Sequence, residues 1–159
     1  MRVRFMLIVF SAALLILAGC FKNKDSEPCT PKTVAGEMSV MTKYATDSSI
    51  ATTEDASGLL YEIIEQGTGA TPTVSSTVTV KYIGRTMSGT LFDQNTTTGA
   101  TFSLSGLIKA WQIAVPKIQV GGKIKIITPS LLAYSCNPYV PAYLNNQPLY
   151  FYIELISVQ

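Results

Sequence analysis

The most informative absence in this sequence of 159 residues is histidine, which does not occur at all. Without histidine the chain has no imidazole to act as a general base near neutral pH, and therefore no Ser-His-Asp triad. Imidazole is also the commonest zinc ligand in proteins, so we expect neither a metal nor another cofactor. Enzyme classes whose chemistry depends on histidine are thereby excluded.

Charged residues are scarce, at 14% of the chain, and their net charge is only +2. Arg2 and Arg4 contribute to that total but belong to an N-terminal segment that we expect to be removed. The mature chain is then close to neutral. Nucleic-acid binding requires Lys and Arg clustered on one face, so we expect no nucleic acid among the partners.

The apolar run near the N-terminus, residues 5–18, is too short to span a bilayer comfortably and follows a basic end, as in an export signal. It ends in Leu17-Ala18-Gly19-Cys20, which resembles the lipobox of bacterial lipoproteins. Cys20 would then carry lipid, the alternative being an ordinary thiol behind a signal peptide. We predict a lipoprotein signal peptide over residues 1–19 and a lipid-anchored protein of the cell envelope, at the outer membrane.

Cysteine is rare as well, with three residues in the chain. If Cys20 is lipidated, only Cys29 and Cys136 remain, and an oxidising envelope would allow them to pair. The sequence does not show whether their geometry permits a bond, so a disulfide and two free thiols both stay open.

Residues 20–57 are predicted to form a lipidated tether and a short helical leader. The first part is polar and interrupted by Pro28 and Pro31, which is typical of a linker. Between Thr33 and Ala45 the apolar residues recur at spacings of four, three and four, which favours one amphipathic helix. Residues 47–57, rich in Ser, Thr and Asp, read as a connector.

Most of the remaining chain alternates apolar and polar residues, which is typical of strands with one buried face. The expected strands are 59–65, 77–85, 90–93, a short one around Phe102, 123–128 and 149–158, with a Thr- and Gly-rich loop at 94–100. The exception is the helix-like stretch 106–111, which ends in the only tryptophan, Trp111. We predict an α+β fold: a bent antiparallel β-sheet, or half-barrel, wrapped around one short α-helix.

Short motifs in this region, in their order and spacing, resemble the FKBP-type peptidyl-prolyl cis-trans isomerases over about residues 58–159, which we predict to be the isomerase domain. They are Gly58-Leu59-Leu60-Tyr61, Gly67-Thr68-Gly69, Val78-Thr79-Val80-Lys81-Tyr82-Ile83-Gly84, Gly89-Thr90-Leu91-Phe92-Asp93, Phe102-Ser103-Leu104, Leu107-Ile108-Lys109-Ala110-Trp111, Gly121-Gly122-Lys123, Ala133-Tyr134 and Phe151-Tyr152-Ile153-Glu154-Leu155. A leader helix followed by this domain also resembles the lipoprotein members of the family.

The resemblance implies a pocket of aromatic and aliphatic side chains that receives the prolyl residue of a substrate. Its catalytic residues would be Tyr82, Phe92, Asp93, Trp111 and Tyr134, and its substrate-binding residues Phe102, Leu107, Ile108 and Phe151. Trp111 would form the floor, while the backbone N–H of Ile108 and the hydroxyl of Tyr134 would bind substrate carbonyls. Asp93 would join a hydrogen-bond network with Tyr82. Outside the resemblance, these aromatics are also compatible with a plain core, and Asp93 with a turn residue that binds local N–H groups.

Such a pocket suits the reaction, because rotating an X-Pro bond needs neither a nucleophile nor proton transfer. The barrier of about 18 to 20 kcal/mol arises from amide resonance, which places negative charge on the carbonyl oxygen. An apolar pocket removes water from that oxygen and disfavours the planar, dipolar amide, while oriented hydrogen bonds hold the twisted one. The absence of histidine is therefore no obstacle.

Four features depart from the family pattern. The loop 94–100 has no arginine, where the family often adds one to the network of Asp93. Ala110 replaces a usual glycine and is expected to add a methyl near the pocket rim. Pro116 should bend or stop the helix. The segment after Tyr134, over about 135–146, replaces a glycine-rich one and leaves substrate preference open.

Three functions remain after this reading. The first is a monomeric, lipid-anchored prolyl isomerase that assists folding of exported proteins and acts on proline-containing polypeptides. The second is a binding module that holds unfolded chains or a partner in the same pocket without turnover. The third is an accessory lipoprotein that recognises polysaccharide through exposed Tyr, Thr and Asn, for which only composition speaks.

Overall fold

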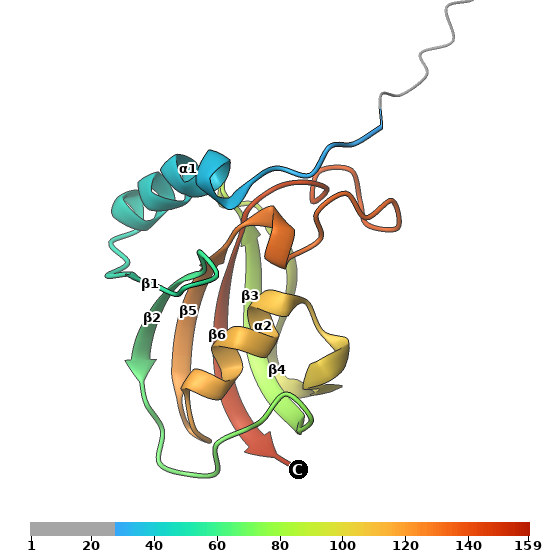
Figure 1. Ribbon diagram of the computed structural model, residues 1–159. Helices are drawn as coiled ribbons and strands as arrows, with labels where there is room; N and C mark the ends of the chain where they lie inside the picture. The colour runs from blue at the N-terminus through green and yellow to red at the C-terminus, as the bar shows by residue number, and fades with distance from the viewer. Residues whose placement is uncertain (1–27) are drawn as a thin grey trace, which may run out of the picture.

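The computed structural model describes residues 28–159, which form a six-stranded sheet and two α-helices (Figure 1). The helices are α1 (Val34–Asp47) and α2 (Lys109–Ala114), and the strands are β1 (Thr53–Glu54), β2 (Leu60–Glu65), β3 (Thr77–Thr86), β4 (Leu91–Ser103), β5 (Lys123–Thr128) and β6 (Leu149–Val158). Short 3-10 turns occupy Leu104–Gly106, Val115–Lys117 and Ser130–Leu132. The predicted signal peptide and the predicted lipid site at Cys20 lie outside the described residues.

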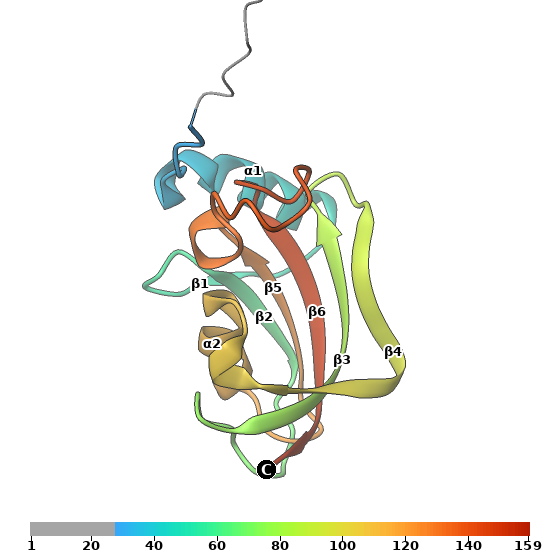
Figure 2. The same cartoon turned by 90° about the vertical axis from the view of Figure 1, so that its right-hand side faces the viewer.

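The strands follow the order β1-β2-β5-β6-β3-β4, and each neighbouring pair is antiparallel. The sheet bends around α2 without closing, so β1 and β4 remain edges (Figures 1 and 2). The predicted α+β half-barrel around one short helix is confirmed. Along β3 the burial alternates as expected, with Val78, Val80 and Tyr82 on the buried side.

The two faces of the sheet bury different clusters. On the concave face, Ile124 and Ile126 of β5 pack in the main core with α2. The next residue, Ile127, points to the opposite face and packs with Met41 and Ala45 of α1. Because side chains alternate along a strand, one stretch of β5 anchors both helices.

Helix α1 confirms the helix predicted within 33–45. Thr33 caps its N-terminus, since the Thr33 hydroxyl accepts a 3.1 Å hydrogen bond from the N–H of Gly36. Its buried residues are Glu37, Met41 and Ala45, which share one side of the helix. The leader is therefore packed onto the sheet, while the domain boundary between residues 57 and 58 remains a prediction.

The prediction of a loop at 94–100 is wrong, because β4 is continuous from Leu91 to Ser103. Gln94 pairs with Ile83, and Ala100 pairs with Val80. Between them, Thr96–Gly99 has no regular partner and forms a bulge closed by a 3.0 Å hydrogen bond from the N–H of Gly99 to Oδ1 of Asn95. Gly99 has a φ of 83°, a left-handed conformation that glycine adopts without a steric penalty, and it therefore permits the bulge. The strand resumes beyond it.

Among residues 28–159, no helix combines the length and the apolar character needed to cross a bilayer.

Candidate functional site

Trp111 forms the base of a pocket on the concave face of the sheet. It lies on α2, where it is only 4% exposed and shares its buried side with Ala110 and Ala114. Small residues beside the indole let this short helix approach the sheet closely. Helix α2 ends at Ala114 and continues as the 3-10 turn Val115–Lys117, so the predicted stop at Pro116 is confirmed.

Three aromatic rings surround the indole of Trp111, all nearly edge to face. The ring centroid of Tyr82 lies 5.3 Å from that of Trp111, Phe151 lies at 5.6 Å and Phe102 at 6.3 Å. Interplanar angles of 78 to 90° match the preferred geometry of aromatic pairs. The rings come from β3, β6 and β4, so the curved sheet assembles the walls and the helix supplies the floor.

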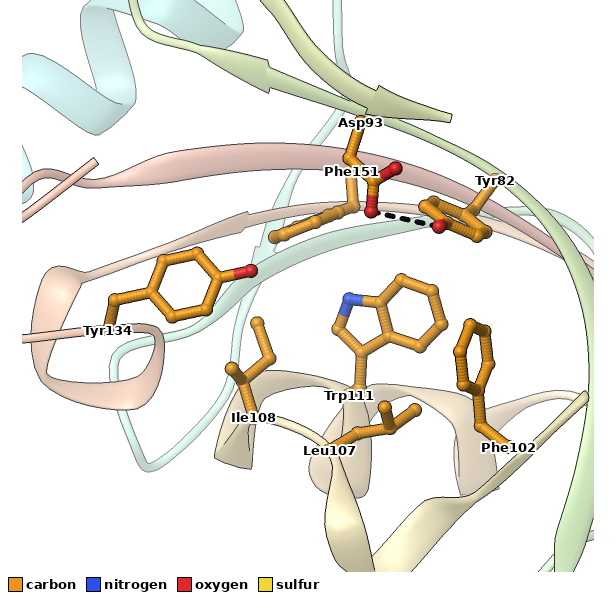
Figure 3. A pocket seen from close by; sticks show the side chains of 8 residues that line it. All are labelled: Tyr82, Asp93, Phe102, Leu107, Ile108, Trp111, Tyr134 and Phe151. Atoms are coloured by element: carbon orange, nitrogen blue, oxygen red, sulfur yellow. Dashed lines mark hydrogen bonds between the residues drawn. The ribbon is translucent and has the colours of Figure 1, made fainter. Parts of the chain in front are cut away.

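The cavity above Trp111 has a volume of about 140 Å³. It is lined by Tyr82, Asp93, Phe102, Leu107, Ile108, Trp111, Tyr134 and Phe151 (Figure 3). All the expected pocket residues except Phe92 are in this set. A mostly apolar cavity with a few convergent polar groups is the usual form of a ligand site.

Phe92 instead supports the wall from behind. Its ring packs edge to face on Phe151, with centroids 5.6 Å apart and an interplanar angle of 87°. Gly84 makes room for this pair, because a Cβ there would lie 2.7 Å from Cζ of Phe92. The sequence signal was available, since Gly84 occupies the next inward position after Val78, Val80 and Tyr82 on β3.

The polar edge of the pocket begins with Tyr82 and Asp93. The hydroxyl of Tyr82 donates a 2.8 Å hydrogen bond to Oδ2 of Asp93 (Figure 3). Burial, followed by the hydrogen bond to Asp93 and its negative charge, raises the pKa of Tyr82 to about 12. Tyr82 therefore keeps its proton at every physiological pH and remains a donor.

Asp93 has no arginine partner from the part of β4 that follows it, because residues 94–100 contain no arginine. Arg85, on β3, donates instead to the carbonyl oxygen of Gly89 at 2.8 Å. Both partners lie within the hairpin that joins β3 to β4, so this contact stabilises the turn.

Tyr134 closes the opposite side of the cavity, and its hydroxyl points into the space between Ile108, Trp111 and Phe151 (Figure 3). Burial, and secondarily the charge of Asp93, raises the pKa of the Tyr134 hydroxyl above its ordinary value. The group is thus a protonated donor at neutral pH. Such a donor can bind a carbonyl oxygen that enters the pocket.

The backbone before α2 is fixed by Gln112. Its Nε2 donates to the carbonyl oxygens of Leu107 at 2.7 Å and Ser105 at 3.1 Å. Ile108 precedes the first turn of α2, where N–H groups have no partner inside the helix. The Ile108 N–H is therefore available beside the cavity that its side chain lines.

Ala110 corrects one sequence-based expectation. Its side chain is 0% exposed and belongs to the main core, and it is not among the residues that line the cavity. Residue 110 lies about 100° around the helix from Trp111, and its methyl group is buried in the main core. It therefore fills the core under the pocket and leaves the rim unchanged.

A disulfide joins the segment after Tyr134 to the N-terminal leader. Cys136 forms a disulfide with Cys29, across a sequence separation of 107 residues. The region contains turns rather than regular elements, and Tyr139 and Tyr143 are exposed on it.

Comparison with known proteins decides the family. The model of the FKBP-type peptidyl-prolyl cis-trans isomerase family matches residues 69–156, which is more than half of the chain. The chain belongs to this family. The matched region includes every residue that lines the cavity.

Two bacterial relatives illustrate the similarity within the FKBP-type family. The chain is 37% identical over 119 residues to the FKBP-type peptidyl-prolyl cis-trans isomerase FkpA of Escherichia coli K12, covering 74% of this chain and 43% of the relative. It is 41% identical over 105 residues to the outer membrane protein MIP of Legionella longbeachae, covering 65% and 45%. The chain thus spans less than half the length of these curated relatives.

The fold agrees with that of a solved peptidyl-prolyl cis-trans isomerase. The crystal structure of a peptidyl-prolyl cis-trans isomerase from Pseudomonas syringae pv. tomato superposes with a TM-score of 0.66 at 28% identity, covering 82% of this chain and 98% of that one. Leader helix α1 begins 35 residues before the matched family region, at Val34 against residue 69. The family model therefore does not cover the leader helix.

Proposed function

We propose that this protein catalyses cis-trans isomerisation of X-Pro peptide bonds in exported polypeptides, as a lipid-anchored member of the FKBP-type family in the cell envelope. The observation that carries the proposal is the cavity of about 140 Å³ with Trp111 as its base and the donors of Tyr134 and Ile108 at its side. A prolyl ring is of the size and polarity that this space accepts.

In the proposed mechanism the pyrrolidine ring lies on the indole of Trp111, between Tyr82, Phe102 and Phe151. The carbonyl oxygen of the X-Pro bond loses its water and faces apolar side chains, which disfavours the dipolar planar amide. The Ile108 N–H and the Tyr134 hydroxyl hold the flanking carbonyls and so fix the substrate on either side of the rotating bond.

Tyr82 and Asp93 would act as a fixed polar edge. Their 2.8 Å hydrogen bond holds the Tyr82 ring against Trp111 and orients the Asp93 carboxylate across the cavity. No proton moves in this mechanism. It therefore does not require the imidazole that the sequence lacks.

The proposed location combines two observations. The N-terminal apolar run ends in a lipobox-like motif, Leu17-Ala18-Gly19-Cys20. A relative 41% identical to this chain is named an outer membrane protein. Labelling of cells with a radioactive fatty acid tests the anchor: the wild type should be labelled and Cys20→Ser should not, and equal labelling of the two would contradict it.

A second candidate is a proline-binding module without turnover. It is favoured by the replaced segment after Tyr134, which carries the exposed aromatics Tyr139 and Tyr143 where the family has glycines.

An isomerisation assay separates the two candidates. If the protein is an isomerase, the purified protein should accelerate isomerisation of peptides with an apolar residue before proline, an event that takes tens to hundreds of seconds without a catalyst. Binding of these peptides without any acceleration would select the module instead.

A further inference from the structure

The leader and the turn that carries Tyr134 are joined by several contacts that lie outside the cavity. The chain before α1 runs beside the segment that follows β5 (Figures 1 and 2). The side-chain amide of Asn146 forms two hydrogen bonds with the residues before α1. Its Nδ2 donates to the carbonyl oxygen of Thr30 at 2.9 Å, and its Oδ1 accepts from the N–H of Lys32 at 3.1 Å. The Cys29–Cys136 disulfide ties the same two segments.

Glu37 is the buried part of this connection. It is 3% exposed, although a carboxylate is seldom buried without a specific partner. Oε2 of Glu37 accepts two hydrogen bonds from Ser130, one from the N–H at 2.8 Å and one from the hydroxyl at 3.0 Å. Ser130 is 0% exposed, so the side chain of Glu37 replaces water for both donors.

Ser130 in turn organises residues 130–135, which we call the Tyr134 turn. The carbonyl oxygen of Ser130 accepts from the N–H of Ala133 at 3.0 Å and from the N–H of Ser135 at 2.8 Å. Ser135 has a φ of 44°, a left-handed conformation that is uncommon for a residue other than glycine and costs backbone energy. These two bonds enclose Tyr134, the residue whose hydroxyl enters the cavity.

We infer that Glu37 is a positioning residue of the prolyl site, which acts by fixing Ser130 and thereby the hydroxyl of Tyr134. The leader helix is then a part of the active site rather than a spacer, although residue 37 lies outside the matched family region. This inference rests on the proposed function. It differs from a simple role in stability because it assigns the effect of Glu37 to one hydroxyl group.

The experiment is a double-mutant cycle on the full-length protein, with kcat/KM measured on an X-Pro peptide. Tyr134→Phe and Glu37→Ala should each lower kcat/KM by about tenfold, because small displacements of groups that position a substrate cost up to about 10²-fold. The double variant should be within about twofold of Tyr134→Phe alone, since a displaced hydroxyl and an absent one are equivalent. Independent effects, which would multiply to about a hundredfold loss, would overturn the inference.

Two matched variants separate position from stability. Glu37→Gln keeps an acceptor for Ser130 and should retain kcat/KM within about threefold of the wild type, since the neutral acceptor preserves the geometry. Met41→Ala removes a fully buried side chain from the same helix, one turn further on and on the outer face of the sheet. It should leave kcat/KM within about twofold if the protein is folded at the assay temperature, because Met41 packs with Ala45, Leu60 and Ile127 in a cluster that contains no residue of the Tyr134 turn.

A second readout does not need turnover. Amide hydrogen exchange of residues 130–136 should be faster in Glu37→Ala than in Met41→Ala, relative to the rest of the sheet, because the Ala133 and Ser135 amides depend on Ser130. Equal exchange in the two variants would overturn the inference even if activity fell. If the wild type neither turns over nor binds proline peptides, the proposed function fails, and the role of Glu37 at a prolyl site fails with it. The exchange experiment still shows in that case whether Glu37 holds the Tyr134 turn in place.

Discussion

The Tyr82 hydroxyl and the Asp93 carboxylate are 2.8 Å apart although their residues are not paired across β3 and β4. Tyr82 pairs with Asn95, and Asp93 pairs with Gly84, so the contact runs diagonally along the sheet. Diagonal neighbours remain within reach of long aromatic side chains. Gly84, which pairs with Asp93, has no side chain to obstruct the rings of Phe92 and Phe151.

Removing the phenolic oxygen tests this contact. Tyr82→Phe should lower the free energy of unfolding by about 1.5 to 3 kcal/mol, the usual contribution of a hydrogen bond to a charged group. Urea denaturation measures the change. Tyr152→Phe is the control, since Tyr152 lies on neighbouring β6 and is only partly buried, and it should alter stability by no more than about 0.5 kcal/mol. Equal stability of Tyr82→Phe and the wild type would contradict a structural role for the bond.

Truncating the base of the pocket should abolish its use. Trp111→Ala is expected to lower peptide binding and turnover below detection and to cost about 3 to 5 kcal/mol of stability, because it removes a large buried aromatic. Leu155→Ala is a matched control: Leu155 is 0% exposed in the same core but does not line the cavity. Its free energy of unfolding should fall by a comparable amount, about 2 to 5 kcal/mol. Its kcat/KM should stay at the wild-type value as long as the protein is folded. Folding of both variants is checked by circular dichroism, and similar activity losses would argue against a specific site at Trp111.

Turnover should depend little on pH between about 6 and 8. Carboxyl groups ordinarily titrate near pH 4 and tyrosines near pH 10, and the chain has no histidine to titrate between them. The raised pKa values of Tyr82 and Tyr134 move the pocket hydroxyls further from this range. A bell-shaped profile, or a tenfold change in kcat/KM across this window with an unchanged circular dichroism spectrum, would show that a titrating group takes part.

Stability should decline in alkali. Burial raises the pKa of Tyr82 to about 12 and that of Tyr150 to about 12, both above the ordinary value of 10.0. Between these values the unfolded chain releases protons that the folded protein retains. The contribution of these two tyrosines to the free energy of unfolding is therefore constant below about pH 10 and is lost as the pH rises toward about 12. Urea denaturation at several pH values measures the slope. Tyr82→Phe should reduce it, and an unchanged slope in this variant would assign the effect elsewhere.

The disulfide should be present in envelope-derived protein and should stabilise it. A bond that closes a loop of 107 residues restricts the unfolded chain, and native disulfides typically contribute about 2 to 4 kcal/mol. Reduction should lower the unfolding midpoint of the wild type and leave that of the Cys29→Ser, Cys136→Ser double variant unchanged. Mass spectrometry under non-reducing conditions should find the Cys29–Cys136 cross-link, and free thiols at both positions would rule it out.

The sequence by itself determined the sheet, the short helix and most of the pocket. Alternation along β3 requires one buried face, and the spacing of apolar residues in α1 requires one packed side, since both follow from the period of the local backbone. The ordered motifs placed Trp111, Tyr82, Asp93 and Tyr134 together, because strand order and register within a family restrict which positions can meet.

Only the tertiary structure decided which side chains meet across long sequence separations. Phe92 lies behind Phe151 and not in the cavity, because Gly84 opens the space for its ring. The apolar spacing that predicts α1 does not involve Glu37, yet the carboxylate of Glu37 binds Ser130, 93 residues further along the chain. Local periodicity states which face of an element is buried, but the partner of a buried polar atom depends on how the whole chain packs around it.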